Sequence, residues 1–181
     1  IYNNDFYPIE WDKVVLPFNA GGKKMGSGYK KVLKPRKPKM FVSHWDVCLN
    51  SDSCYRVLRK RGLSIHFTID NDGTIFQYLD MNHIAYHAGG KHNPTTVGVE
   101  ISNAFYPKYQ GWYQRHGFGK RPMVKDAHCH GNSMKPFMDF YPAQVEALKA
   151  LMKTVHKTLD IPLECPLDED GDTLYAVDEK A

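Results

Sequence analysis

The chain has 181 residues, of which 42% are hydrophobic and 24% are charged, and its formal net charge is +4. This length and composition are typical of one globular domain with a sizeable core. The longest apolar runs fall far short of the ~20 residues that a membrane-spanning helix needs, so we predict no membrane span.

Charge is spread unevenly along the chain. Residues 23–39 are strongly basic and residues 164–179 are strongly acidic. The simplest interpretation is a solvated basic arm at 1–40 and a solvated acidic tail at 161–181. The arm could also contact an anionic surface such as lipid headgroups or cell-wall polymer. It has no recognised DNA-binding pattern and no aromatic-interleaved single-strand motif, so no nucleic-acid partner is predicted.

The predicted elements are strands mixed with helices. One signal is Pro142, which suits the first turn of a helix whose apolar residues recur at three- and four-residue steps. Another is Gly73, which tolerates the positive φ of a hairpin turn between two strands. In chain order we predict a strand at 40–44, a helix at 53–61 capped by Ser53 and closed by Gly62, strands at 63–69 and 74–79 joined by Asn71-Asp72-Gly73, a strand at 96–102 and a helix at 142–159.

Residues 103–140 are rich in Gly, Tyr, His and Pro, which indicates a long surface insertion within a core at 41–160. Strands mixed with one-sided helices predict an α/β protein with a mixed central β-sheet flanked by helices.

Histidines fall at informative places in this pattern. His44 ends a strand, His66 lies within a strand, His87 follows one, and Glu100 ends the apolar run TVGVE. Neutral imidazoles bind Zn²⁺, and a nearby carboxylate can take a proton from water at a hydrolytic metal site. The residues alone leave two alternatives open, a core histidine at position 44 and a solvent-facing glutamate at position 100.

Four cysteines form no pattern of paired zinc knuckles. Cys48 and Cys54 flank the polar loop LNSDS, and a bridge between them is sterically reasonable if that loop folds back. Cys129, inside His128-Cys129-His130, and Cys165 could be free thiols.

Four stretches carry a family resemblance. FVSHWDVC, SIHFTIDNDGTIFQYLD, HIAYHAGGKHNPTTVGVEIS and YPAQVEALKALMKTV follow the order seen in zinc-dependent N-acetylmuramoyl-L-alanine amidases. This type-2 amidase family includes phage lysins and the peptidoglycan recognition proteins. The resemblance covers about residues 41–159 and is interrupted by the insertion. It implies the fold of that family.

The resemblance also implies a function. The chain would be a peptidoglycan hydrolase that uses Zn²⁺ to cleave the amide between N-acetylmuramic acid and the L-alanine of the stem peptide. It would act on the cell wall as a secreted, periplasmic or phage-released enzyme, such as an endolysin. The alternative is a non-catalytic recognition module that binds peptidoglycan or a muropeptide.

Residue by residue, the resemblance assigns roles. His44 matches the first zinc ligand, and Glu100 matches the catalytic glutamate that activates water. His87 and Asn93 match residues of the substrate groove and its loop, and we include His66 among the predicted substrate-binding residues.

The spacing of Cys48 and Cys54 resembles the small disulfide loop of peptidoglycan recognition proteins, which favours a bridge. Ile65 stands where some relatives carry a groove tyrosine.

One departure concerns the other zinc ligands. The family supplies a second histidine and a Cys or Asp after the long helix, but no histidine follows His156 here. We expect the remaining ligands beyond Ala181, on a separate C-terminal fragment or a missing segment. Two alternatives remain: the insertion supplies substitute ligands from His128, Cys129 or His130, or the site holds no zinc and the protein only binds peptidoglycan.

Overall fold

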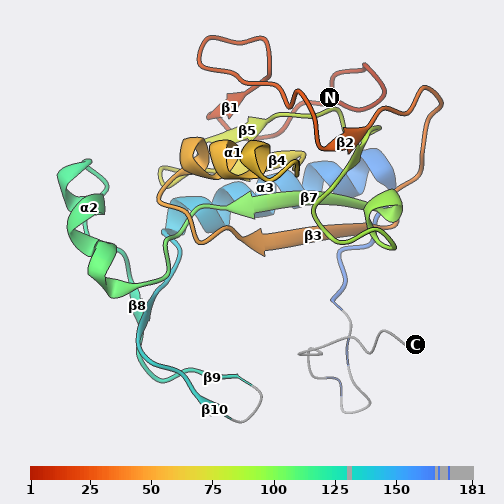
Figure 1. Ribbon diagram of the computed structural model, residues 1–181. Helices are drawn as coiled ribbons and strands as arrows, with labels where there is room; N and C mark the ends of the chain where they lie inside the picture. Colours follow the sequence, from red (N-terminus) through yellow and green to blue (C-terminus); the bar gives the residue numbers. More distant parts are fainter. Residues whose placement is uncertain (130–131, 166, 168–170, 172–181) are drawn as a thin grey trace.

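A mixed five-stranded β-sheet forms the centre of the molecule (Figure 1). The computed structural model describes residues 1–129, 132–165, 167 and 171. Strand order is β1-β5-β4-β7-β3, in which β3, β7 and β4 run parallel, β5 is antiparallel to β4, and β1 is parallel to β5. The elements are β1 (Val14–Val15), β2 (Tyr29–Lys30), β3 (Met40–Trp45), α1 (Ser51–Lys60), β4 (Phe67–Ile69), β5 (Ile75–Gln77), β6 (Ile84–Ala85), η1 (Asn93–Thr95), β7 (Thr96–Ile101), η2 (Pro107–Tyr109), α2 (Gln110–Arg115), β8 (Met123–Val124), β9 (His128–Cys129), β10 (Asn132–Ser133), β11 (Phe137–Met138) and α3 (Pro142–Leu159).

Two helices cover opposite faces of this sheet. Leu151 and Val155 of α3 pack on alternate residues of the strands, such as Val97 and Val99 of β7. Leu58 of α1 packs in a second cluster on the other face, together with residues that precede β4 and follow β5. The predicted class, a mixed sheet flanked by helices, is confirmed. In the described part of the chain, no helix combines the length and apolar character that crossing a membrane requires.

The predicted helices differ in how well their ends match. α3 has the predicted bounds, whereas α1 begins two residues earlier than predicted because Asn50, not Ser53, is its N-cap. The Asn50 side chain accepts a hydrogen bond from the Ser53 amide at 2.8 Å, and the Ser53 hydroxyl accepts one from the Asn50 amide at 3.1 Å. This reciprocal pair is a capping box, and Ser53 occupies its third helical position.

The N-terminal segment 1–40 is packed against the core, which differs from the predicted solvated arm. Met25 is fully buried beside α1, and β1 and β2 pair with β5 and β6. The Arg36 guanidinium donates hydrogen bonds to the carbonyl oxygens of Met81 at 2.7 Å and His83 at 2.8 Å. Positive charge in this segment therefore does not make it a free arm.

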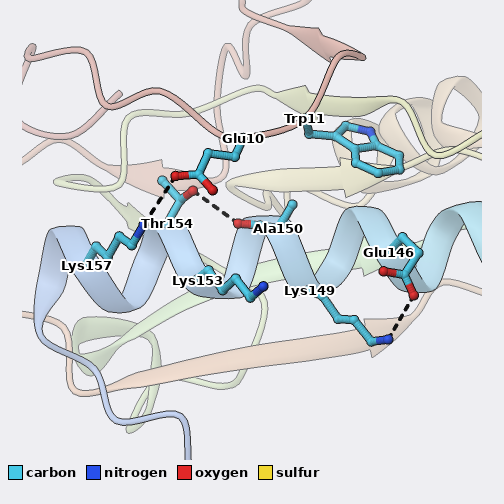
Figure 2. Close-up of a pocket in the computed structure, with 8 residues that line it drawn as sticks. All are labelled: Glu10, Trp11, Glu146, Lys149, Ala150, Lys153, Thr154 and Lys157. Carbon is cyan, nitrogen blue, oxygen red and sulfur yellow. Dashed lines mark hydrogen bonds and ion pairs between the residues drawn. The ribbon is translucent and has the colours of Figure 1, made fainter.

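The same segment also crosses α3 (Figure 2). The Trp11 indole nitrogen donates to the Gly73 carbonyl at 2.8 Å, and Glu10 lies 3.3 Å from Lys157. Between this segment and α3 lies a shallow cavity of about 190 Å³. Its charged side chains are exposed, so their ion pairs contribute little to stability.

The described residues between 103 and 140 contain regular elements, and α2, β8, β9 and β10 lie away from the sheet (Figure 1). The anchor of this insertion is Arg121, which is 2% exposed. The Arg121 guanidinium lies 4.3 Å from the ring centres of both Tyr113 and Tyr141. It also donates to the Ser102 carbonyl at 2.8 Å and the Gln144 side chain at 3.0 Å, which links the insertion to β7 and α3.

Candidate active site

His44 and Glu100 lie side by side at the carboxyl ends of two neighbouring parallel strands. In the register between β3 and β7, His44 is the partner of Glu100. Neighbouring strands are about 4.8 Å apart and residues in register point to the same face, so both side chains project from the face that α1 covers. Glu100 is partly exposed, and the strand register places it next to His44.

His87 reaches His44 from the loop after β6. Its Nδ1 lies 2.8 Å from His44 Nε2, and its Nε2 lies 3.1 Å from the Thr96 hydroxyl oxygen. That hydroxyl donates to the His92 carbonyl at 3.1 Å, so it accepts a hydrogen bond from His87 Nε2. His87 Nδ1 then accepts from His44 Nε2. This chain of hydrogen bonds leaves His44 Nδ1 as the nitrogen with a free lone pair.

Gly98 makes room for His87. A Cβ atom at position 98 would lie 2.4 Å from His87 Cε1 and 2.8 Å from Ile65 Cδ1, which is too close for any side chain. The glycine of the VGVE motif therefore lets the imidazole pack directly on β7.

His66 is a core residue in this structure. It has no exposed surface, its Nδ1 accepts a hydrogen bond from the Gly98 amide at 3.1 Å, and its Nε2 lies 3.0 Å from the His83 carbonyl. Its ring packs edge-to-face against His87, with 5.9 Å between ring centres. The substrate contact predicted for His66 does not fit this burial, because both nitrogens bind backbone inside the protein.

Asn93 shapes the loop that carries His87. Its side-chain oxygen accepts hydrogen bonds from the amides of His87 at 3.1 Å and Ala88 at 2.8 Å. Beside this loop lies an open groove of about 720 Å³. Its lining comprises Lys30, Leu63, Ile84, Tyr86, His87, Gly89, Gly90, Asn93 and Pro94. His87 and Asn93 thus both line this groove.

Burial changes the proton affinities of the site. It raises the pKa of Glu100 to about 8, with a further increase from Asp46 and a small opposing effect of Arg61. Burial and then the neighbouring His44 lower the pKa of His87 to about 3, and burial lowers the pKa of His44. Both imidazoles are therefore neutral near pH 7, the form in which histidine binds metals.

Asp46 is a site residue to which the sequence assigned no role. Its Oδ1 accepts from the amides of Cys48 at 2.8 Å and Asn103 at 3.1 Å, and its Oδ2 accepts from the Ser102 hydroxyl at 3.0 Å. Burial raises its pKa to about 6 although these hydrogen bonds oppose the shift. A charged residue directly after β3 was the one available signal for it.

Cys48 and Cys54 are free thiols, which corrects the predicted disulfide. Their sulfur atoms lie within 4.8 Å of each other and of an Asp46 oxygen, whereas a disulfide requires about 2.05 Å. The Cys54 thiol donates a hydrogen bond to Cys48 instead. Its hydrogen bond to Cys48, together with burial, raises the pKa of Cys54, and accepting that bond lowers the pKa of Cys48.

The residues that the structure describes do not complete a zinc site around His44. Within them, His44 belongs to no group of three candidate ligand atoms within 4.8 Å of one another. His128 lies on the β9–β10 hairpin of the insertion and is exposed, with its Nε2 3.1 Å from the Ser133 hydroxyl. His130 lies outside the described residues. Among the described residues, His44 Nδ1 is thus a candidate ligand atom without a complete set of three donors around it.

Comparisons with known proteins agree with the fold. The family model described as N-acetylmuramoyl-L-alanine amidase matches residues 34–165. No curated protein sequence matches the chain. Among solved structures, the chain is similar to the amidase AmiD from E. coli, in complex with the substrate anhydro-N-acetylmuramic acid-L-Ala-D-gamma-Glu-L-Lys, with a TM-score of 0.50 and 19% identity over 75% of this chain and 54% of AmiD. It thus spans about half the length of AmiD.

Two further structures have lower TM-scores. The endolysin amidase LysCS from Clostridium intestinale has 19% identity and a TM-score of 0.49 over 85% of this chain and 80% of LysCS. Drosophila peptidoglycan recognition protein SA has 16% identity and a TM-score of 0.47 over 83% of this chain and 76% of that protein. The family model covers well over half of the chain, including His44, His87 and Glu100. The chain belongs to the N-acetylmuramoyl-L-alanine amidase family.

Proposed function

We propose that this protein hydrolyses peptidoglycan at the amide bond between the lactyl group of N-acetylmuramic acid and the L-alanine of the stem peptide. The observation that carries the proposal is the strand-end pair of His44 and Glu100, joined to the groove by His87, inside the region that the amidase family model matches. The protein would then act on bacterial cell wall, as an endolysin or a wall-processing amidase does.

Glu100 is the proposed general base. Its pKa of about 8 is close to the pH at which hydrolases work, and a base is most effective when its pKa lies near the working pH. The carboxylate would take a proton from the attacking water and pass it to the leaving α-amine of alanine. One group can do both because the water loses its proton before the amine needs one.

Zinc is the proposed cofactor, with His44 as one of its ligands. The free lone pair on Nδ1 and the neutral imidazole suit this role, although the described residues supply no complete set. When bound, Zn²⁺ would polarise the carbonyl of the substrate as a Lewis acid and lower the pKa of water. The remaining ligands would come from outside the described residues.

The groove beside His87 is the proposed muropeptide site. Gly89 and Gly90 allow a substrate backbone to approach closely, since no side chain stands in the way. Lys30 is the one charged side chain among the described residues that line this groove. A single cation suits a stem peptide that carries carboxylates.

A Glu100→Gln variant tests the proposed base. We expect it to lose at least ~100-fold in turnover of a defined N-acetylmuramoyl peptide, measured as newly released alanine α-amines, because general base catalysis typically contributes this much. Glu146→Gln, on the exposed side of α3, is the matched control and should keep wild-type turnover. Equal turnover by Glu100→Gln and the control would overturn the assignment of the base.

The incomplete donor set around His44 favours a second candidate, a recognition module that binds muropeptide without cutting it. Wild-type protein that binds the muropeptide, contains no stoichiometric zinc and releases no amines would support this candidate over the hydrolase.

A further inference from the structure

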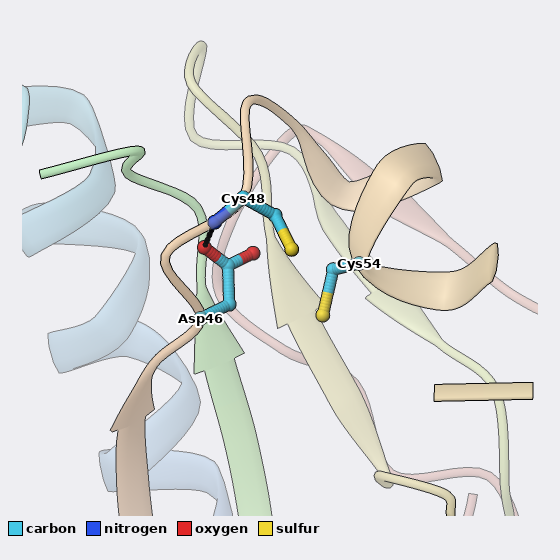
Figure 3. A group of neighbouring side chains, drawn as sticks. All are labelled: Asp46, Cys48 and Cys54. Carbon is cyan, nitrogen blue, oxygen red and sulfur yellow. Dashed lines mark hydrogen bonds between the residues drawn. The ribbon is translucent and has the colours of Figure 1, made fainter. Parts of the chain in front are cut away.

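Asp46, Cys48 and Cys54 form a compact group of potential metal ligands at the junction of β3 and α1. One ligand atom from each lies within 4.8 Å of the other two, and this is the one such group that the described residues contain. Asp46 and Cys48 lie on the loop that leaves β3, and Cys54 lies on the first turn of α1 (Figure 3). The group uses neither His44 nor His87, so the proposed function has not assigned it.

The carboxylate is held so that one oxygen faces the sulfur atoms. Oδ1 accepts from the Cys48 amide, and in Figure 3 the other oxygen points to the side on which both sulfur atoms lie. The Ser102 hydroxyl fixes that second oxygen, Oδ2, at 3.0 Å. A carboxylate oxygen keeps a further lone pair after one such hydrogen bond, and outer-shell donors of this kind usually orient metal-binding carboxylates.

Both thiols are at least partly shielded from solvent. Cys54 is 2% exposed and Cys48 is half-buried, so a cation bound between them would be largely shielded from water. Two sulfur atoms and one carboxylate oxygen are a donor set for a thiophilic divalent cation of the Zn²⁺ class, with a fourth position for water. Mg²⁺ and Ca²⁺ prefer oxygen ligands alone and are not expected here.

We propose that Asp46, Cys48 and Cys54 bind one thiophilic divalent cation, which ties the end of β3 to the start of α1. Both thiols lose their protons to the solvent when the cation binds, so that two S–H bonds are replaced by two metal–sulfur bonds. The added positive charge offsets the repulsion among two thiolates, Asp46 and the nearby Glu100.

Cadmium titration of the full chain tests this site. The protein is reduced with a phosphine, freed of metal and titrated with Cd²⁺, while the ultraviolet thiolate-to-cadmium charge-transfer band and proton release are recorded. We expect the charge-transfer band to saturate at one Cd²⁺ per chain, with close to two protons released. A Cys129→Ser/Cys165→Ser double variant, which keeps only Cys48 and Cys54 among the four cysteines, should behave as wild type.

Single variants identify the ligands. Cys48→Ser and Cys54→Ser should weaken binding at least ~10-fold and remove most of the band, and Asp46→Asn should weaken binding by about 10-fold. Buried Cys54 can be needed for folding, so circular dichroism is recorded for each variant to check that it is folded. Cys48 is only half-buried, so Cys48→Ser tests the site even if Cys54→Ser does not fold. His44→Asn should leave the band unchanged, so failure of this site is distinguishable from failure of the proposed amidase.

Several results would overturn the proposal. The reduced wild type could show no charge-transfer band with stoichiometric Cd²⁺. Alternatively, the band could survive Cys48→Ser, survive Asp46→Asn at full affinity, disappear in the Cys129→Ser/Cys165→Ser variant, or require His44.

Discussion

At the scale of single residues, the folded protein favours the protonated form of Glu100, so ionisation of this side chain lowers the free energy of unfolding. The folded protein raises its pKa from 4.5 to about 8, mainly through burial, so between these values the folded state keeps a proton that the unfolded state loses. Stability from this group is fully present below about pH 4.5 and is lost as the pH rises through about 8. A residue that lowers stability in this way is more readily explained by catalysis than by folding.

This sign gives a prediction for Glu100→Gln. The variant cannot ionise, so its melting temperature relative to wild type should rise steadily from pH 4.5 to pH 8 and then level off. Differential scanning calorimetry at closely spaced pH values measures this. A difference that stays flat across this pH range would contradict the raised pKa of Glu100.

Sequence and structure agree best for residues whose role depends on strand position. His44 and Glu100 were predictable because each ends an apolar strand, and β3 and β7 are adjacent parallel strands. The state of Cys48 and Cys54 was not predictable, because their spacing is compatible with either a bridge or two thiols.

At the scale of elements, β7 and the loop before it act as one unit. Gly98 provides the space that His87 occupies, and Asn93 holds the loop in place through two backbone amides. The position of His87 in HAGG therefore depends on the glycine of VGVE. The two motifs are separate in sequence, since His87 lies nine residues before Thr96, the first residue of β7.

Gly98→Ala tests this dependence. The added Cβ should displace the His87 ring, break its 2.8 Å contact with His44 and destabilise the protein by about 1–3 kcal/mol, a typical cost of overpacking. The imidazole ¹⁵N resonances of His44 and His87 and a urea titration measure the two effects. Gly90→Ala is the matched control, since no atom lies within 4 Å of a Cβ there. Unchanged imidazole resonances in Gly98→Ala would contradict the packing role.

The insertion was only partly predictable. Its position and surface exposure follow from its composition, but its strands are two residues long, too short for a periodic pattern. Arg121 was missed because arginine is almost never fully buried, and its partners lie as far as 50 residues away in sequence.

Arg121→Leu should destabilise the protein by on the order of 3 kcal/mol or more, because it leaves buried carbonyl and amide oxygens without donors. Arg121→Lys should recover only part of this loss, since an ammonium group cannot reproduce the planar fork between Tyr113 and Tyr141. Urea unfolding curves measure both. Lys120→Ala, at an exposed position, is the control. Equal stability of all three variants would contradict the role of Arg121 in anchoring the insertion.

At the scale of the whole molecule, the fold brings together three parts of the chain that are separate in sequence: the N-terminal segment, the strand ends that carry His44 and Glu100, and the loop that carries His87. Residues 1–40 were predicted to be an arm because they carry charge and glycine, yet Lys30 lies in the groove wall and Arg36 binds the backbone around β6. Only long-range contacts distinguish such a packed segment from a solvated one, and no local pattern contains them.

The proposed amidase activity requires all three parts: the groove wall from the N-terminal segment, His44 and Glu100 from the sheet, and His87 from its loop. The most direct test is digestion of a defined N-acetylmuramoyl-L-alanyl peptide in ¹⁸O-labelled water, with the products identified by mass spectrometry. We predict one ¹⁸O atom in the lactyl carboxyl group of N-acetylmuramic acid and a free, unlabelled peptide that begins with L-alanine. An intact substrate, or label at a sugar or within the stem peptide, would contradict the proposal.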